Sequence, residues 1–106
     1  GKDQGHCTLM LTQHVAEGKW FAVNVSAENL MGRDAVGHKP DPLFTLMRFH
    51  EDGMFHLHQS EVKRSTYSPT WWAITMSLAK LCDDKPETRL MFRVFDQVKP
   101  TLRRVL

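Results

Sequence analysis

The chain has 106 residues, of which 42% are hydrophobic and 9% aromatic, which is enough apolar material for the core of one domain. Its formal net charge of +2 is too small to indicate nucleic-acid binding, and aromatic residues are rarely interleaved with the basic ones. The longest nearly apolar stretch, residues 71–81, is too short and too interrupted to span a bilayer. We therefore expect a single domain over residues 1–106, with no nucleic-acid partner and with any membrane contact peripheral.

Cysteine usage and the first residue bear on where the chain works. Cys7 and Cys82 lie far apart without a metal-type spacing, so free thiols in a reducing compartment are favoured over a disulfide. No charged-then-apolar leader opens the chain at Gly1, and the missing initiator Met indicates a processed piece of a larger multidomain protein. We interpret the protein as cytoplasmic and peripheral on membranes.

Apolar and polar residues alternate along most of the chain with a period of two, as they do in half-buried strands. The clearest examples are Phe21, Val23 and Val25 and the run from Leu90 to Phe95, whereas helical periodicity is weak throughout. Seven segments are predicted as strands: residues 7–15, 20–27, 43–50, 54–62, 72–78, 90–95 and 101–106. Turns rich in Gly, Pro and Asp separate them, so we expect an all-β fold, an antiparallel β-sandwich of seven to eight strands.

The order of the strands predicts which loops meet. If consecutive strands run antiparallel, alternate connections fall at one end of the sandwich, so residues 28–42, 64–70 and 97–100 gather there. Asp34, Asp41 and Asp96 then share one rim, and the turn at residues 51–53 lies at the other end. Three carboxylates at one rim favour a hard cation, above all calcium. The plainer interpretation is that these aspartates are turn residues, since Asp favours loops.

Several short runs, taken in order, resemble a known family. They are Val25-Ser-Ala-Glu-Asn-Leu30, Arg33-Asp34, Gly37-His-Lys-Pro-Asp-Pro42, Ser60-Glu-Val62, Ser68-Pro-Thr-Trp71 and Val94-Phe-Asp96. Over residues 7–98 the chain resembles a C2 domain, the calcium-dependent phospholipid-binding β-sandwich. His58-Gln-Ser-Glu-Val62 and Leu81-Cys-Asp-Asp84 are most similar to the C2 domains of copines. The resemblance implies a Greek-key sandwich in which Asp34, Asp41 and Asp96 bind calcium.

The third loop departs from that family. Where the family places further aspartates, this chain has Gln97, Val98 and then no acid as far as Leu106. Calcium takes about 6 to 8 oxygens, so three carboxylates need water or a lipid phosphate to complete the shell. We therefore expect calcium to be a weak or conditional cofactor. The family also has one more strand, so we expect a sandwich that lacks its last strand or has an open edge.

Basic and apolar residues in the same loops suit an acidic membrane surface. Arg33, Lys39 and Lys99 lie in or beside the predicted rim, and each would contribute on the order of 1 kcal/mol near an anionic leaflet. Val36 and Val98 are placed to enter the membrane interface. The alternative is that all five are ordinary solvated loop residues. We predict a peripheral module that docks on acidic phospholipids through its loop aspartates.

A second patch is predicted around the turn at residues 51–53. Four of its members would share one face of the two strands: Arg48, His50, His56 and His58. Lys63 and Arg64 follow the second strand. If the faces coincide, the patch gains charge as histidines protonate near a pKa of about 6.5. The His56-x-His58 spacing is also that of a zinc ligand pair, with His50 as a conjectural third ligand. A solvated, partly basic strand face is the plainer interpretation.

The motifs of catalysis are missing from the sequence. There is no nucleophile elbow, no HExxH pattern and no phosphate-cradling Gly-rich loop, so we expect no enzymatic activity. The alternative to membrane docking is a calcium-independent protein-interaction module that uses the basic face or the open sheet edge.

Two adjacent tryptophans lie at the start of the predicted strand 72–78. Successive side chains of a strand point to opposite faces, so we expect one of Trp71 and Trp72 in the core and the other at the surface or an interface.

Overall fold

The computed structural model describes residues 8–16, 20–30, 39–51, 53–82 and 88–106. Within these ranges the chain forms seven strands and one short helix: β1 (Thr8–Ala16), β2 (Trp20–Glu28), β3 (Pro42–His50), β4 (Gly53–Gln59), β5 (Ile74–Ser77), α1 (Leu78–Cys82), β6 (Arg89–Lys99) and β7 (Leu102–Val105). Each of the seven predicted segments overlaps one of these strands. Three of the strands are shorter than predicted: β4 ends at Gln59, β5 has only the four residues Ile74–Ser77, and β7 has only the four residues Leu102–Val105.

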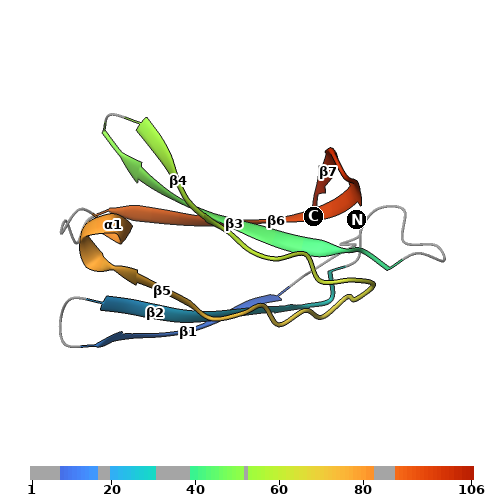
Figure 1. Cartoon of the computed structure of the whole chain (residues 1–106), viewed down its shortest axis with the longest axis horizontal. Coiled ribbons are helices and arrows are strands. Elements are labelled where there is room, and N and C mark those ends of the chain that lie inside the picture. The colour runs from blue at the N-terminus through green and yellow to red at the C-terminus, as the bar shows by residue number, and fades with distance from the viewer. Residues whose placement is uncertain (1–7, 17–19, 31–38, 52, 83–87) are drawn as a thin grey trace, which may run out of the picture.

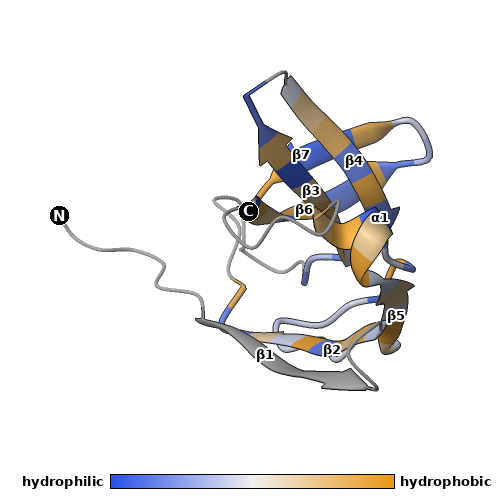
Figure 2. Ribbon diagram, turned by 90° about the vertical axis from the view of Figure 1, so that its left-hand side faces the viewer, coloured by the Kyte–Doolittle hydropathy of each residue, from blue (hydrophilic) through white to orange (hydrophobic). Residues whose placement is uncertain are grey.

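The strands form two antiparallel sheets that lie one above the other (Figures 1 and 2). One sheet has three strands in the order β1-β2-β5, and the other has four in the order β4-β3-β6-β7. β6 pairs with β3 rather than with β5, so the chain crosses between the sheets before and after β5. Such crossings are typical of Greek-key sandwiches, and the predicted antiparallel β-sandwich is confirmed.

Alternate residues of facing strands build the core between the sheets. On β2 these are Phe21, Val23, Val25 and Ala27, all of them buried. The same cluster contains residues from β3, from the loops and from the β5–α1 segment: Leu30, Phe44, Leu46, Trp71, Ile74, Met76 and Leu81. The period of two that predicted β2 therefore also identifies its buried face.

Helix α1 replaces the end of the predicted strand 72–78. The Ser77 hydroxyl accepts a hydrogen bond from the Lys80 backbone N–H (3.1 Å), as an N-cap residue does. From β3, Arg48 Nη1 donates to the Lys80 carbonyl oxygen (2.8 Å), which satisfies a group that a short helix leaves open. A helix of one turn depends on such partners because it is marginal by itself. Its last residue, Cys82, is a free cysteine, whereas Cys7 lies outside the described residues.

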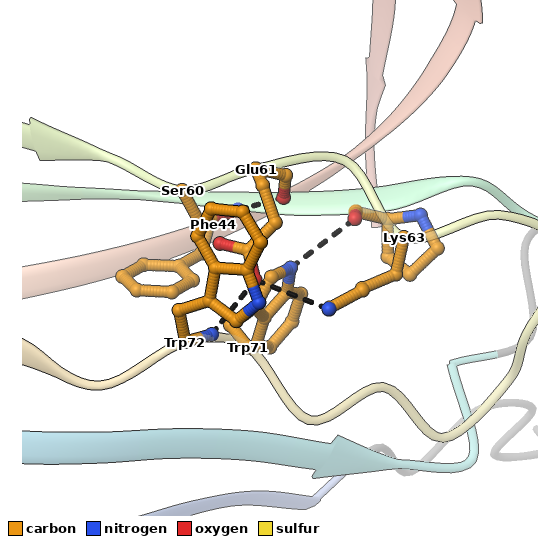
Figure 3. Close-up of polar contacts among 7 residues, drawn as sticks. Phe44, Ser60, Glu61, Lys63, Trp71 and Trp72 are labelled. Carbon is orange, nitrogen blue, oxygen red and sulfur yellow. Dashed lines mark hydrogen bonds and ion pairs between the residues drawn. The ribbon is translucent and has the colours of Figure 1, made fainter.

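A buried serine ends β4 and explains why the predicted strand 54–62 stops early (Figure 3). The Ser60 hydroxyl accepts a hydrogen bond from the Phe44 N–H (2.8 Å) and donates to the Glu61 carbonyl oxygen (2.9 Å). The Ser60 backbone N–H donates to the Phe44 carbonyl oxygen (2.9 Å). A side chain thus takes the place of a strand partner, and the chain leaves β3 at this residue.

Trp71 is the largest fully buried side chain, and it contacts both sheets. Its ring packs edge-on against Phe44, with 4.9 Å between the ring centroids, and it is 2% exposed. Its backbone N–H donates to the Val25 carbonyl oxygen (3.0 Å), and its Nε1–H donates to the Pro42 carbonyl oxygen (3.3 Å). Trp72 is 72% exposed, so the prediction that the two tryptophans face opposite ways is confirmed.

We predict that Trp71→Ala lowers the free energy of unfolding by about 3 to 5 kcal/mol, because it leaves a large cavity between the sheets. The adjacent Trp72→Ala is the control and should change that free energy by no more than about 0.5 kcal/mol, as surface substitutions usually do. Urea denaturation followed by circular dichroism measures both values. Equal losses in the two variants would contradict the assignment of Trp71 as the residue that joins the sheets.

Candidate functional site

Loops distant in sequence meet at one end of the sandwich, as predicted. The Thr66 N–H donates to the Pro40 carbonyl oxygen (3.0 Å), and the Leu30 N–H donates to the Tyr67 carbonyl oxygen (2.9 Å). The Gln97 N–H donates to the Asp41 carbonyl oxygen (3.0 Å), which joins the end of β6 to the start of β3. We call residues 39–41, 63–69 and 96–100 the loop rim. The β3–β4 turn lies at the opposite end of the molecule (Figure 1).

Asp96 is the more enclosed of the two acidic residues of the loop rim, at 9% exposed. Its Oδ1 accepts a hydrogen bond from the Asp41 backbone N–H (2.9 Å), and its Oδ2 lies 3.3 Å from Arg104 Nη2. Arg104 comes from β7, where it stands opposite Asp96 in the strand register. A buried carboxylate is stable only when it is paired, and Asp96 is paired by an amide and a guanidinium.

Asp41 uses its side chain to order the neighbouring loop. Its Oδ1 accepts a hydrogen bond from the Ser65 backbone N–H (2.7 Å), and its Oδ2 lies 4.0 Å from Nη1 of the exposed Arg64. Ser65 adopts a left-handed conformation with φ of 48°, which is uncommon for a residue with a side chain. The Asp41 carboxylate therefore acts in this structure as the acceptor that closes a strained turn.

The described part of the loop rim does not fit a tight calcium site. Calcium requires about 6 to 8 oxygen ligands, but all four carboxylate oxygens of Asp41 and Asp96 already face a donor of the protein itself. Within the described ranges, no group of three acidic, histidine or cysteine side chains is placed to hold a metal ion. Asp34, the remaining predicted ligand, lies outside those ranges. The structure brings together two of the three predicted ligands and supplies arginine beside each.

Arg104 of β7, which pairs with Asp96 of the loop rim, is the residue that sequence reasoning missed. The signal was available, because two successive arginines follow a Lys-Pro-Thr turn directly after the strand that carries Asp96. A hairpin across that turn places one of them opposite Asp96. The observed register does so, with Asp96 paired to Arg104 and Gln97 to Arg103.

Three of the five residues predicted to contact lipid are described, and all three point to solvent. Lys39 and Lys99 are exposed, and Val98 is 44% exposed. Lys39 Nζ lies 5.7 Å from the ring centroid of Tyr67, over its face. The other two, Arg33 and Val36, lie outside the described residues.

The six basic residues predicted as one face do not form one. A β-bulge between β3 and β4 pairs His58 with Leu46 but His56 with Met47. Because Leu46 and Met47 point to opposite faces of β3, His58 turns toward the core and His56 turns away from it. The ring of His58 accordingly lies 5.9 Å from that of Phe44. The zinc pair suggested by the His56-x-His58 spacing loses its geometric basis.

The remaining members of that predicted face are distributed elsewhere. Arg48 lies on the core side of β3, where it binds the carbonyl groups of α1, and its guanidinium lies 5.2 Å from the ring centroid of Phe55. His50 lies on the same side, 6.2 Å from that ring. Lys63 and Arg64 belong to the loop rim, and Arg64 faces Asp41. The correction follows from the bulge and from the position of α1, neither of which a period of two predicts.

An exposed aromatic residue beside the loop rim has a fixed polar setting (Figure 3). Glu61 Oε2 accepts a hydrogen bond from the Trp72 backbone N–H (2.7 Å) and lies 3.2 Å from Lys63 Nζ. Lys63 Nζ also lies 5.5 Å from the ring centroid of Trp72. The ion pair and the cation–π contact hold the lysine against the indole, so charge and aromatic surface face solvent together.

Comparison with known proteins supports the fold. No known protein-family profile matches the chain. The chain is similar in structure to BON1-C2B, with a TM-score of 0.69 and 16% sequence identity over 82% of this chain and 59% of that one. The fold is C2-like. The chain thus spans 59% of the length of that structure, and the finer resemblance to copines stays a prediction. Among the described residues, no helix has the length and apolar character needed to cross a membrane.

The half-buried position of His58 predicts a pH dependence of stability. Burial lowers the pKa of His58 below 6.5, the nearby Lys80 and His56 lower it further, and Glu61 opposes them. The unfolded chain therefore binds this proton more readily than the folded chain, so stability should fall as pH drops from 6.5 toward the folded pKa. Above 6.5 this group should contribute no pH dependence.

The prediction is tested with His58→Gln, which removes the titrating group. Thermal melts at about pH 7.5 and about pH 5.5 should show a smaller difference in melting temperature for His58→Gln than for the native chain. The matched control is His56→Gln on the exposed face of the same strand, which should keep most of the native difference. An unchanged difference in His58→Gln would show that other groups cause the pH dependence.

Proposed function

We propose that this domain is a peripheral binding module that docks on acidic phospholipid surfaces through the loop rim, with calcium in a weak and conditional role. A C2-like fold is in general that of a membrane-binding or protein-binding module. The observation that carries the finer proposal is the composition of the loop rim. Its exposed members include cations and an apolar side chain, whereas its two described carboxylates face arginines.

The balance of charge at the loop rim supports attraction to anionic lipid. Lys39, Arg64 and Lys99 are exposed there, and each basic residue near an acidic leaflet contributes about 1 kcal/mol. Asp96 is enclosed and paired with Arg104, so it presents little negative charge to an approaching phosphate. Val98 adds apolar surface at the position where related loops have an aspartate. The proposed place of action is the cytoplasmic surface of a membrane, within a larger protein.

The arginines also support the conditional role of calcium. A cation is attracted to Asp96 only as far as Arg104 leaves its oxygens available, because the two positive charges compete for the same carboxylate. The guanidinium of Arg104 is always charged at physiological pH. Arg104 also lies directly opposite Asp96, in the pairing of β6 with β7. We propose that Arg104 neutralises most of the negative charge of Asp96.

A calcium-independent protein-interaction module is the alternative, and the structure changes the surface that it would use. The basic hairpin face does not exist as one surface, because Arg48 and His58 lie on the core side of the sheet whereas His56 lies on the opposite face. The exposed Trp72 beside Lys63 is better placed to contact a partner. Aromatic residues with a fixed cation are common anchors at protein interfaces. Both roles are binding roles, and neither involves catalysis.

The membrane proposal is tested by co-sedimentation with vesicles that contain phosphatidylserine. Lys39→Glu combined with Lys99→Glu should weaken binding at least about tenfold, since two attractive charges become repulsive. Lys80→Glu is the matched control, because this exposed lysine lies on α1, at the end far from the loop rim. Native binding should differ less than about threefold between calcium and chelator. Binding seen only with calcium would overturn the conditional role of the ion.

The competition between Arg104 and calcium gives a separate prediction. Arg104→Gln should raise calcium affinity several-fold, because it frees one oxygen of Asp96 while keeping a side chain of similar length. Isothermal titration with calcium measures the affinity, and circular dichroism checks that the fold persists. Adding Asp96→Asn to Arg104→Gln should remove the gain. An unchanged calcium affinity in a folded Arg104→Gln variant would show that the arginine does not limit the ion.

A further inference from the structure

Residues 60–73 join β4 to β5 without a helix or a strand of their own. A single bridge, between Thr70 and Ser26, interrupts this irregular segment. In its middle, four successive residues carry hydroxyl groups: Ser65, Thr66, Tyr67 and Ser68. They belong to the loop rim and follow two basic residues, so the segment combines nucleophilic groups with positive charge.

Ser65 is the hydroxyl residue that directly follows the basic pair. It is exposed, and Lys63 and Arg64 precede it in the sequence. The Arg64 side chain is 82% exposed. Thr66, the next residue, is half-buried, and its Oγ1 accepts a hydrogen bond from the Ser68 N–H (3.0 Å). Of these two hydroxyl groups, that of Ser65 is therefore the one open to an approaching enzyme.

Ser68 is also exposed, but the chain beside it is fixed to the three-stranded sheet. The next residue, Pro69, is buried, and its carbonyl oxygen accepts a hydrogen bond from the Ala27 N–H of β2 (3.0 Å). An enzyme that modifies a side chain within its own cleft must draw the neighbouring backbone away from the protein surface. The bond to β2 opposes this movement at Ser68.

The backbone of Ser65 favours a local opening. Two hydrogen bonds close its turn, from the Ser65 N–H to Asp41 Oδ1 (2.7 Å) and from the Thr66 N–H to the Pro40 carbonyl oxygen (3.0 Å). The Ser65 φ of 48° is left-handed, so the closed turn stores strain that is released when the segment extends. Opening a few bonds of a surface segment costs far less than unfolding the domain.

We infer that Ser65 is a phosphorylation site for a serine/threonine protein kinase that selects basic sequences and uses ATP as the phosphoryl donor. The Ser65 hydroxyl oxygen forms a bond to the γ-phosphorus, and the bond from that phosphorus to the β,γ-bridging oxygen breaks. ADP leaves with the electron pair, and the hydroxyl proton passes to a carboxylate base of the kinase. Kinases select substrates by their pattern of charge, and Lys63 and Arg64 supply a basic one.

The phosphate acts on the loop rim, and this part of the inference rests on the proposed membrane function. A phosphoserine carries about −1.5 to −2 charge at pH 7. The exposed cations of the described rim are Lys39, Arg64 and Lys99, so one phosphate cancels most of their attraction to anionic lipid. The phosphate also stands beside the Asp41 carboxylate, which accepts the Ser65 N–H, and the two like charges repel. Phosphorylation should therefore release the domain from an acidic membrane.

The site is tested on the whole chain with a kinase of the protein kinase C type and magnesium ATP, and tandem mass spectrometry locates the phosphate. Ser65→Asn should lose most of the incorporated phosphate, because asparagine tolerates the left-handed backbone but has no hydroxyl. Arg64→Gln should slow incorporation several-fold. Lys99→Gln, which changes a rim cation distant in sequence, is the matched control and should leave the rate unchanged. No incorporation, or phosphate on Thr66 or Ser68 in place of Ser65, overturns the site.

Co-sedimentation with vesicles that contain phosphatidylserine tests the effect on binding. Each chain is compared with itself after treatment with kinase, in the presence and in the absence of ATP. ATP should weaken binding of the native chain at least about tenfold, and binding of Ser65→Asn less than about twofold. Equal binding of the phosphorylated and untreated native chains overturns the regulatory role. Because mass spectrometry reads the modification without lipid, a failure of the proposed membrane function is seen separately, as an untreated chain that does not bind vesicles.

Discussion

Trp71 joins the two sheets, and the geometry of the loop rim depends on it. Its backbone N–H binds β2 at Val25, and its indole N–H binds β3 at the Pro42 carbonyl oxygen. The ring between these two bonds packs against Phe44 and fixes the separation of the sheets. Because Asp41 directly precedes Pro42, the same contact positions the first carboxylate of the rim. A change in the core at this residue would therefore be transmitted to the surface that we propose to bind lipid.

Pairing, rather than the number of acidic residues, sets the electrostatic character of the rim. Asp96 is nearly enclosed, and an enclosed carboxylate must be compensated. Arg104 does this from the neighbouring strand, while the Asp41 amide supplies a hydrogen bond to the other oxygen. The two carboxylates that seemed from sequence to form an anionic cluster are thus compensated by arginines in the described part of the rim. Lys39 and Lys99, which are exposed, then give it a positive sign.

The distribution of basic residues shows why periodicity alone assigns faces incompletely. One extra residue in β4, at the bulge, separates His56 from His58 and sends them to opposite faces of the sheet. On β6 no bulge intervenes between Arg89 and Arg93, so their alternation holds and both face solvent. In the sequence, both His56 with His58 and Arg89 with Arg93 have the even spacing of residues that share a strand face. Only the register shows that the first is interrupted and the second is not.

The sequence by itself determined all seven strands, through the alternation of apolar residues and through turn residues. The order of the strands then determined the end of the sandwich where Asp41 and Asp96 meet. These features follow from local pattern and chain direction. Only the tertiary structure decided that Ser60 ends β4 and that β6 pairs with β3. The physical reason is that each of these depends on register between segments far apart in the chain. Long-range contacts set that register, and no local pattern records them.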